Sequence, residues 1–189
     1  MDGIFLINKE KGCSSFDVIR ALKRKFSEKK MGHTGTLDPF AEGLLIVCLG
    51  KATKAIPFLE DDDKDYLAVL SLGKETDTLD LDGKFINEKE VGNITKDDVE
   101  NTFKKFLGEI TQTPPKYSAL KKNGIPLYEY ARKNIDVEIP SRKVYISKLE
   151  LKSFNDNEIT FFASVSKGTY IRSLGYDIAL ALNTVGHLK

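Results

Sequence analysis

Residues 32–39 constrain this chain more than any other stretch. They read Gly-His-Thr-Gly-Thr-Leu-Asp-Pro, and an apolar run follows them at residues 43–50. The segment has too much Gly and Pro, and too little apolar periodicity, for a helix or a strand. Pro39 fixes its own φ and disfavours the helical conformation at Asp38. The apolar run is typical of a buried strand. We therefore expect a short acidic side chain on a stiffened loop beside a core strand.

This arrangement has two interpretations. A charged residue on a loop that is anchored by a buried strand is common in active sites. Asp-Pro is also a frequent turn opener, so the residues by themselves leave a purely structural role open for Asp38. Gly32 and Gly35 permit unusual backbone angles and the close approach of another backbone.

The remaining periodicity predicts an α+β fold. Apolar spacing predicts a helix that Ser14 or Ser15 caps and that continues to Phe26. Further helices are expected over residues 95–107 and 170–182. Strands are expected at residues 4–7, 44–49, 66–72, 145–151 and 158–166, the last two paired through a turn at 155–157. Without a regular βαβ repeat, these elements predict a mixed, largely antiparallel sheet flanked by helices and loops.

Composition predicts an ordinary globular protein. The 189 residues are 41% hydrophobic and 30% charged, which suits one domain over residues 1–189. No apolar run is long enough to span a membrane, and Met1-Asp2-Gly3 does not resemble a secretory signal. Cys13 and Cys48 are expected to be thiols in a reducing compartment. We therefore expect a cytoplasmic location.

Charge is unevenly distributed along the chain. Residues 1–59 hold 10 Lys and Arg against 6 Asp and Glu, and residues 116–143 hold 7 against 3. Residues 60–100 hold only 5 basic side chains against 14 acidic ones. Because phosphate binding depends on local Lys and Arg clusters, the net charge of +1 does not exclude RNA. The acidic stretch is expected to face away from RNA, and each basic run could also be a plain solvated surface.

Several familiar motifs are excluded. Residues 78–83 resemble half of a calcium loop, but Thr78 and Lys89 occupy the first and twelfth ligand positions, so we interpret the segment as a turn. The chain contains no phosphate-binding P-loop and no dinucleotide fingerprint. With two histidines and no Cys cluster, a zinc site is not expected. We expect chemistry without a cofactor or a metal.

The motifs, taken in order, resemble the TruB-type tRNA pseudouridine synthases over nearly the whole chain. The active-site motif of that family is G-H-T/S-G-x-L-D-P followed by G-x-L and an apolar strand. Other matching segments are Gly-Ile-Phe-Leu-Ile-Asn-Lys at 3–9, Lys-Asp-Tyr at 64–66, Pro-Pro-Lys-Tyr-Ser-Ala at 114–119, Leu-Tyr-Glu-Tyr-Ala-Arg at 127–132 and Lys-Gly-Thr-Tyr-Ile-Arg-Ser-Leu at 167–174. The resemblance implies the pseudouridine synthase fold.

It also implies an isomerase that converts a uridine of the tRNA T-loop, at position 55, to pseudouridine. Asp38 would be the essential carboxylate, Arg172 the cation that keeps it ionised, and Tyr66 the aromatic residue that stacks on the target base. Whether Asp38 attacks a carbon or removes a proton from C2′ stays open. No cofactor, no membrane and no obligate protein partner are implied, and a monomer is expected.

The resemblance assigns further residues to substrate and RNA. His33, Gly35, Tyr170 and Lys9 would contact the substrate. An RNA-gripping insertion is expected over residues 112–143, where basic and aromatic side chains alternate. The RNA-binding residues implied are Tyr117, Lys121, Lys122, Arg132, Lys133, Lys143 and Lys167.

The chain departs from the family at two points. Lys-Glu-Lys-Gly at residues 9–12 lacks the proline that is usual in the opening motif, and family members continue beyond residues 186–189 into a further strand and a C-terminal domain. Three alternative functions stay open: a guide-RNA-dependent pseudouridine synthase subunit, a tRNA-folding chaperone and an inactive RNA-binding module.

Overall fold

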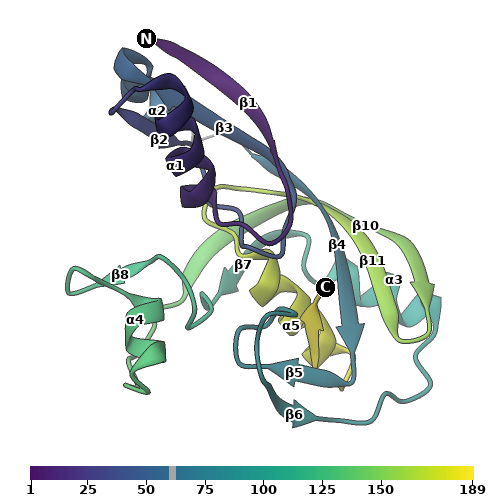
Figure 1. Cartoon of the computed structure of the whole chain (residues 1–189). Coiled ribbons are helices and arrows are strands. Elements are labelled where there is room, and N and C mark those ends of the chain that lie inside the picture. The colour runs from purple at the N-terminus through teal and green to yellow at the C-terminus, as the bar shows by residue number, and fades with distance from the viewer. Residues whose placement is uncertain (60–62) are drawn as a thin grey trace. The chain divides into compact units, whose positions relative to one another are not determined.

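The computed structural model describes residues 1–59 and 63–189. The chain groups into two compact units, Met1–Asp62 and Asp63–Lys189. Figure 1 labels the elements of both units, which are described separately below. The described elements are α-helical and β, and the paired strands of every sheet are antiparallel. The predicted fold class, α+β with a largely antiparallel sheet, is therefore confirmed.

The first unit is a three-stranded sheet with a helix. Its strands are β1 (Gly3–Lys9), β2 (Met31–His33) and β3 (Gly43–Leu49), and β3 lies in the centre in the order β1-β3-β2. The helix is α1 (Ser15–Phe26); a 3-10 helix (Gly50–Ala55) and the short helix α2 (Ile56–Leu59) follow β3. The apolar run at 43–50 is thus the central strand, as its composition predicted.

The core of this unit lies between α1 and the sheet. Its buried residues are Ile19 of α1 and Leu45, Val47 and Leu49 of β3. Partly buried side chains complete it: Phe5, Ile7, Val18, Leu22 and Met31. The helical spacing of the apolar residues in α1 places them on one face of the helix. The alternation in the strands likewise places apolar side chains on the face of the sheet that meets α1.

A capping box defines where α1 begins. The Ser14 side chain accepts a hydrogen bond from the backbone N–H of Asp17, and the Asp17 carboxylate accepts one from the backbone N–H of Ser14 at 2.9 Å. This arrangement satisfies two of the N–H groups that a helix start leaves unpaired. The hydrogen bonds from Ser14 lower the pKa of Asp17 to about 2. Ser14, and not Ser15, is therefore the cap.

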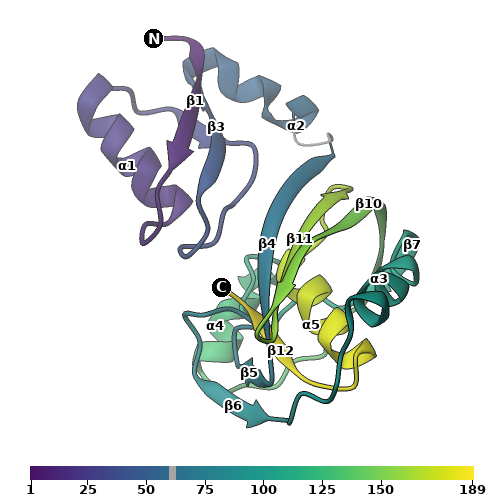
Figure 2. The same ribbon diagram turned by 90° about the vertical axis from the view of Figure 1, so that its right-hand side faces the viewer.

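The second unit contains a five-stranded sheet in the order β12-β4-β11-β10-β7, which Figure 2 shows from the side. Its strands are β4 (Lys64–Leu72), β7 (Gly108–Gln112), β10 (Arg142–Asn155), β11 (Glu158–Val165) and β12 (Gly186–Leu188). The helices α3 (Lys96–Lys104) and α5 (Ile171–Ala181) pack on the sheet. A small hairpin of β5 (Lys74–Thr76) and β6 (Phe85–Glu88) adjoins β12.

The turn between β10 and β11 confirms the hairpin expected there. Asn155 pairs with Glu158, so Asp156 and Asn157 form a two-residue loop. Both have positive φ, 46° and 67°. A two-residue turn needs such angles, and Asp and Asn tolerate them better than most residues.

One face of the five-stranded sheet carries the core. Phe161 and Ile159 of β11 and Leu70 of β4 have no solvent exposure. Phe103 of α3 lies edge-on to Phe161, with ring centroids 5.9 Å apart. Leu174 and Ile178 supply the buried stripe of α5, and Gly175 gives that helix a close approach to the sheet, because a Cβ there would lie 2.8 Å from Leu188.

The predicted helix over residues 95–107 is too long by three residues. Thr95 caps α3 as expected, but α3 ends at Lys104. The next N–H groups, of Lys105 and Phe106, bond to carbonyls three residues back in a tighter turn. Gly108 then starts β7 with φ of 87°. Leu107, the last residue of the predicted helix, is 44% exposed and does not contribute to the core.

The expected insertion contains short elements. Between β7 and β10 lie β8 (Lys121–Lys122), β9 (Ile125–Pro126) and α4 (Leu127–Arg132). The β8–β9 turn has positive φ at Asn123 and Gly124, as a tight hairpin needs. Among the described residues, no helix has the length and apolar character needed to cross a membrane.

We expect Asp177 of α5 to make stability depend on pH. Burial raises the pKa of its carboxyl to about 6, compared with about 4 in an unfolded chain. Between these values the folded protein keeps a proton that the unfolded chain loses, so stability falls as the pH rises through that window. The variant Asp177→Asn does not titrate. Its gain in stability over the parent, measured by urea unfolding, should be larger at pH 7.5 than at pH 4.

The control is Asp156→Asn, at an exposed turn position that accepts either residue. Its stability difference from the parent should be nearly the same at both pH values. An equal gain for Asp177→Asn at pH 4 and pH 7.5 would contradict the assignment of the titration to Asp177.

Candidate active site

In the first unit, the loop that carries Asp38 connects β2 to β3. It starts as an extension of the sheet, since the backbone N–H of Thr34 donates to the carbonyl of Ile46 at 3.1 Å. The Asp38 carbonyl accepts from the N–H of Ala41 at 3.1 Å, which closes a turn over Pro39. The turn chemistry expected of Asp-Pro is therefore present. This turn is closed by the backbone carbonyl of Asp38. The half-buried carboxylate of Asp38 takes no part in that hydrogen bond.

Hydrogen bonds from the start of α1 hold this loop on both sides of Asp38. The Ser15 hydroxyl accepts from the N–H of Leu37 at 3.0 Å and donates to the Leu37 carbonyl, 3.2 Å away. The N–H of Gly12 donates to the carbonyl of Pro39 at 2.9 Å. Ser15 is 1% exposed, so water does not compete for the two hydrogen bonds that Ser15 makes. The backbone of Asp38 is thereby fixed within one residue on either side.

The Lys9 side chain links the same two segments through hydrogen bonds. Its side chain is 1% exposed, and its ammonium donates to the carbonyls of Cys13 at 2.8 Å, Glu10 at 3.0 Å and Pro39 at 3.4 Å. A lysine ammonium has three donors, and three backbone carbonyls satisfy it here. These surroundings differ from those of an exposed substrate contact. The role that they support for Lys9 is to hold the Asp38 loop.

His33 and Gly35 lie at the entrance of this loop. His33 is the last residue of β2 and pairs with Val47. Its ring is half-buried, and its Nδ1 atom is buried without a hydrogen-bond partner among residues 1–59 and 63–189. Gly35 follows Thr34 in the irregular part of the loop. A substrate contact by either residue remains a prediction.

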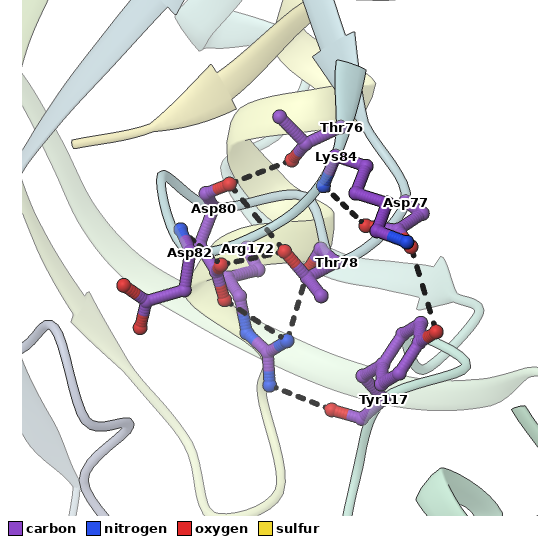
Figure 3. Close-up of polar contacts among 8 residues, drawn as sticks. All are labelled: Thr76, Asp77, Thr78, Asp80, Asp82, Lys84, Tyr117 and Arg172. Carbon is purple, nitrogen blue, oxygen red and sulfur yellow. Dashed lines mark hydrogen bonds and ion pairs between the residues drawn. The ribbon is translucent and has the colours of Figure 1, made fainter. Parts of the chain in front are cut away.

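In the second unit, Arg172 lies in the first turn of α5 and is 5% exposed. Its guanidinium donates to the carbonyl of Thr78 at 2.9 Å and to the carbonyl of Tyr117 at 2.9 Å. It also forms an ion pair with Asp80, whose carboxylate oxygen lies 3.3 Å away. Figure 3 shows that these partners come from the turn at residues 76–84 and from the start of the insertion. The planar guanidinium can bind several oxygens at fixed directions.

Asp80 is itself held by its own turn. Thr78 donates its hydroxyl to the Asp80 carboxylate at 2.6 Å, and the N–H of Asp82 donates to the same oxygen at 3.1 Å. Thr76 donates its hydroxyl to the Asp80 carbonyl at 2.6 Å. Burial raises the pKa of the Asp80 carboxyl, while Thr78 and Arg172 oppose that rise. The turn therefore supplies a buried, oriented carboxylate opposite Arg172.

This carboxylate was not identified by the sequence reasoning. Residues 78–83 were interpreted as a turn, which is correct, but Asp80 also carries the countercharge of Arg172. The signal that could have found it is Thr-x-Thr-x-Asp at 76–80, where two hydroxyls can orient one carboxylate. The acidic stretch 60–100 thus contributes a charged group to the arginine site, in addition to its exposed carboxylates.

The predicted tyrosines occupy two places in the second unit. Tyr66 lies in β4, on the face that also carries the buried Ala68 and Leu70, and its side chain is half-buried. Tyr170 is the N-cap residue of α5. The guanidinium of Arg142 lies over its ring, 5.0 Å from the centroid. Lys167, in the turn before Tyr170, is exposed.

The basic residues of the insertion differ in their surroundings. Lys121 and Lys133 are exposed, and Arg132 lies over the Tyr128 ring at 5.2 Å. Lys122 donates to the Glu138 carbonyl at 2.6 Å. All of these positions leave cationic groups on the surface of α4 and the β8–β9 hairpin, where RNA binding remains a prediction.

Tyr117 and Lys143, which both lie within residues 112–143, already have protein partners. Tyr117 donates its hydroxyl to Asp77 at 3.5 Å, and its carbonyl accepts from Arg172. Lys143 pairs with Glu109 at 2.7 Å, and this hydrogen bond raises the pKa of the lysine. A role of either residue in RNA binding remains a prediction.

The two predicted catalytic charges are located on different units. Asp38 belongs to Met1–Asp62, and Arg172 belongs to Asp63–Lys189. Each is placed by buried polar contacts within its own unit. The pairing of Asp38 with Arg172, and the position of Tyr66 beside Asp38, therefore remain predictions.

Comparison with known proteins assigns the chain to a class of RNA-modifying enzymes. Residues 23–171 match the family described as "TruB family pseudouridylate synthase (N terminal domain)". Since this match covers well over half of the chain, the protein belongs to the TruB family of pseudouridylate synthases.

Two curated relatives are each named tRNA pseudouridine synthase B. The chain is 50% identical to the one from Hydrogenovibrio crunogenus over 188 residues, which are 100% of this chain and 62% of the relative. It is 51% identical to the one from Fusobacterium nucleatum over 184 residues, or 97% of this chain and 64% of the relative. The chain thus spans less than two thirds of the length of these relatives.

Solved structures show the same fold. One, titled "Crystal Structure of a Cbf5-Nop10-Gar1 Complex", superposes with a TM-score of 0.75 at 29% identity, over 99% of this chain and 46% of that chain. Another, titled "Structure of H/ACA RNP bound to a substrate RNA containing 2'-deoxyuridine", gives a TM-score of 0.71 at 27% identity, over 99% and 45% of the two chains.

The role of Lys9 can be tested with Lys9→Met, which keeps most of the side-chain volume and removes the ammonium. Three buried carbonyls would lose a donor, so we expect the free energy of unfolding to fall by about 1–3 kcal/mol. Urea unfolding measures this change. Lys11→Met, at an exposed position of the same turn, should change it by less than about 0.5 kcal/mol. Equal stability of both variants would contradict the proposed tie.

The buried ion pair gives a second stability test. Asp80→Asn keeps an acceptor for Thr78 but removes the charge that faces Arg172. Loss of one partner of a buried pair costs about 3–5 kcal/mol, and the retained hydrogen bond places our expectation at about 3 kcal/mol. The matched control is Asp82→Asn, exposed in the same turn, which should cost less than about 0.5 kcal/mol. Urea unfolding measures both changes. An equally small loss of stability in the two variants would contradict a stabilising ion pair between Asp80 and Arg172.

Proposed function

We propose that this protein converts a uridine of the tRNA T-loop, at position 55, to pseudouridine, with Asp38 as its catalytic carboxylate. The reaction breaks the N1–C1′ bond, turns the base and forms a C5–C1′ bond. The proton on C5 leaves and N1 gains one, so the product is an isomer of the substrate. Nothing needs to be oxidised or added.

The observation that carries the proposal is the loop at residues 32–39. It belongs to a chain that is about half identical to tRNA pseudouridine synthase B over its whole length. Ser15, Gly12 and Lys9 fix the backbone on both sides of Asp38. A carboxylate that must meet a reacting atom within a few tenths of an ångström benefits from such a rigid support.

Asp38 starts the reaction in its ionised form. An aspartate carboxylate can attack a carbon of the sugar or the base, or it can remove a proton from C2′. Both routes need a charged carboxylate in a site from which the flipped base excludes water. A nearby cation favours that charged form. Arg172 is the residue that we assign to this task.

The surroundings of Arg172 support this assignment. Two carbonyls and Asp80 hold the guanidinium, so its direction is set before the substrate binds. Such preorganisation costs no reorganisation at the moment of reaction. Asp80 also balances the buried positive charge, which would otherwise be expensive. In this assignment Asp38 is the reacting carboxylate, and Asp80 is the one that positions Arg172.

The tyrosines and the insertion would hold the RNA. A uridine that leaves its stack loses stacking energy, and an aromatic ring such as that of Tyr66 can restore part of it. Exposed Lys121, Lys133 and Arg132 on the insertion suit the phosphate backbone of a stem-loop. The relatives' name, tRNA pseudouridine synthase B, supports tRNA as the substrate. We propose a cytoplasmic enzyme that acts as a monomer.

The proposal can be tested with a T-arm stem-loop RNA and no guide RNA. We expect the parent chain to form pseudouridine, as measured by mass spectrometry after nuclease digestion. Asp38→Asn should lower the conversion rate by at least about 1,000-fold while the Kd for the stem-loop stays within about twofold. Glu42→Gln, which changes an exposed carboxylate after the same loop, is the matched control and should keep the parental rate.

The other outcomes discriminate the alternatives. Conversion that appears only after a guide RNA is added would favour a guide-dependent enzyme. Binding of the stem-loop without conversion by any variant would favour a tRNA-folding or purely RNA-binding role. An Asp38→Asn variant that converts uridine at the parental rate would overturn the role assigned to Asp38.

A further inference from the structure

The start of α5 depends on a side chain from another strand. Tyr170, the N-cap residue of α5, makes no side-chain hydrogen bond to its own helix within the described structure. Its peptide is held by Gln112, the last residue of β7. The N–H of Tyr170 donates to Oε1 of Gln112 at 2.8 Å, and Nε2 of Gln112 donates to the Tyr170 carbonyl at 3.1 Å. The Gln112 amide therefore pairs with the N–H and the carbonyl of one residue, as a residue of a neighbouring strand would.

The orientation of this amide follows from its partners. A backbone N–H can only donate, so the oxygen of the Gln112 amide must face Tyr170 N, and its nitrogen then faces the carbonyl. Gln112 is 1% exposed. Both bonds are thus shielded from water. Without Gln112 the N–H of Tyr170 would lose this acceptor, whereas the Tyr170 carbonyl would still accept from the N–H of Leu174 at 3.0 Å.

Thr113, the residue after Gln112, binds the other end of the first turn of α5. The hydroxyl of Ser173 donates to the carbonyl of Thr113 at 2.8 Å. Arg172 lies between Tyr170 and Ser173, the two residues that are held. Because both sides of its backbone are fixed to the end of β7, the direction in which the Arg172 side chain leaves α5 is fixed as well.

The ring of Tyr170 is held by a residue of β10, the strand that pairs with β7. Arg142 is the partner of Gln112 in the β7–β10 ladder. Its guanidinium lies 5.0 Å from the centre of the Tyr170 ring and donates to the carbonyl of Gly168. One cross-strand pair therefore holds the backbone of Tyr170 through Gln112 and its ring through Arg142.

We propose that Gln112 is a positioning residue of the isomerase reaction, because its amide fixes the Tyr170 peptide and thereby aligns Arg172 with the reacting site. The inference rests on the proposed function. Gln112 does not touch the base or the Asp38 carboxylate in this assignment, and it acts through the first turn of α5. A loss of alignment should slow the chemical step and leave RNA binding nearly intact, because the basic groups of the insertion are unchanged.

The test is single-turnover pseudouridine formation in a T-arm stem-loop, with RNA binding measured separately. In Gln112→Glu, an ionised carboxylate accepts from Tyr170 N but cannot donate to the Tyr170 carbonyl. A protonated carboxyl can do both. We therefore expect the rate at pH 8 to fall by about 100-fold, as for an ångström-scale misplacement. At pH 5.5 the difference from the parent should narrow to about tenfold or less, with the Kd within about twofold throughout.

Gln112→Met keeps the length of the side chain and loses both hydrogen bonds, so its rate should be low at every pH. Thr111→Val, on the exposed face of β7, is the matched control and should keep the parental rate and pH profile. The folded fraction of every variant is measured by circular dichroism at the assay temperature, and rates are given per folded molecule. If Gln112→Met does not fold, the pH profile of Gln112→Glu still decides.

The outcomes are distinct. An active parent together with a Gln112→Glu rate that recovers at low pH supports the inference. An active parent whose folded Gln112 variants react at the parental rate overturns it and leaves the proposed function standing. An unchanged rate deficit of Gln112→Glu between pH 5.5 and pH 8 also overturns it. A parent that forms no pseudouridine overturns the proposed function, and the role of Gln112 in that reaction falls with it.

Discussion

Each unit of this protein is organised around a buried cation that binds backbone carbonyls. In the first unit Lys9, 1% exposed, donates to three carbonyls. In the second unit Arg172, 5% exposed, donates to two carbonyls and pairs with Asp80. An uncompensated buried charge is very costly. The chain segments that satisfy these cations must therefore take up defined positions, although they have neither helical nor strand hydrogen bonds of their own.

This constraint fixes the irregular segments that carry Asp38 and Asp80. The loop of Asp38 and the turn of Asp80 are rich in Gly, Thr and Asp, a composition that by itself favours several turn conformations. Lys9 and Ser15 select one conformation for the first segment, and Arg172 selects one for the second. Hydrogen bonds to the buried cations thus fix the positions of the loops, as burial of the apolar stripes fixes the positions of α1 and α5. The same contacts therefore set both the fold and the direction of the charged side chains in each unit.

Much of the scaffold could be predicted from the sequence, because its signals are local. Ser14 or Ser15 marked the start of the helix that is α1, the turn expected at residues 155–157 is the β10–β11 turn, and the helix expected over residues 170–182 contains α5. The carboxylate of Asp80 could not be predicted in the same way. Its role depends on Arg172, which is 92 residues away in the sequence, and nothing in a Thr- and Asp-rich turn indicates which of its carboxylates will be buried.

The contacts of Gln112 could not be predicted from the sequence either. The sequence predicted no strand at residues 108–112, and nothing in the pattern distinguished Gln112 from other polar residues. The fold places the end of β7 beside the start of α5 and so brings the Gln112 amide to the N–H and the carbonyl of Tyr170. The insertion between β7 and β10 begins and ends at the residue pair that holds Tyr170, Gln112 and Arg142. A displacement of this segment would therefore act on the first turn of α5, since the carbonyls of Thr113 and Tyr117 accept hydrogen bonds from Ser173 and Arg172 of that turn. The positions of this segment and of the Arg172 side chain are in this way mechanically linked within one unit.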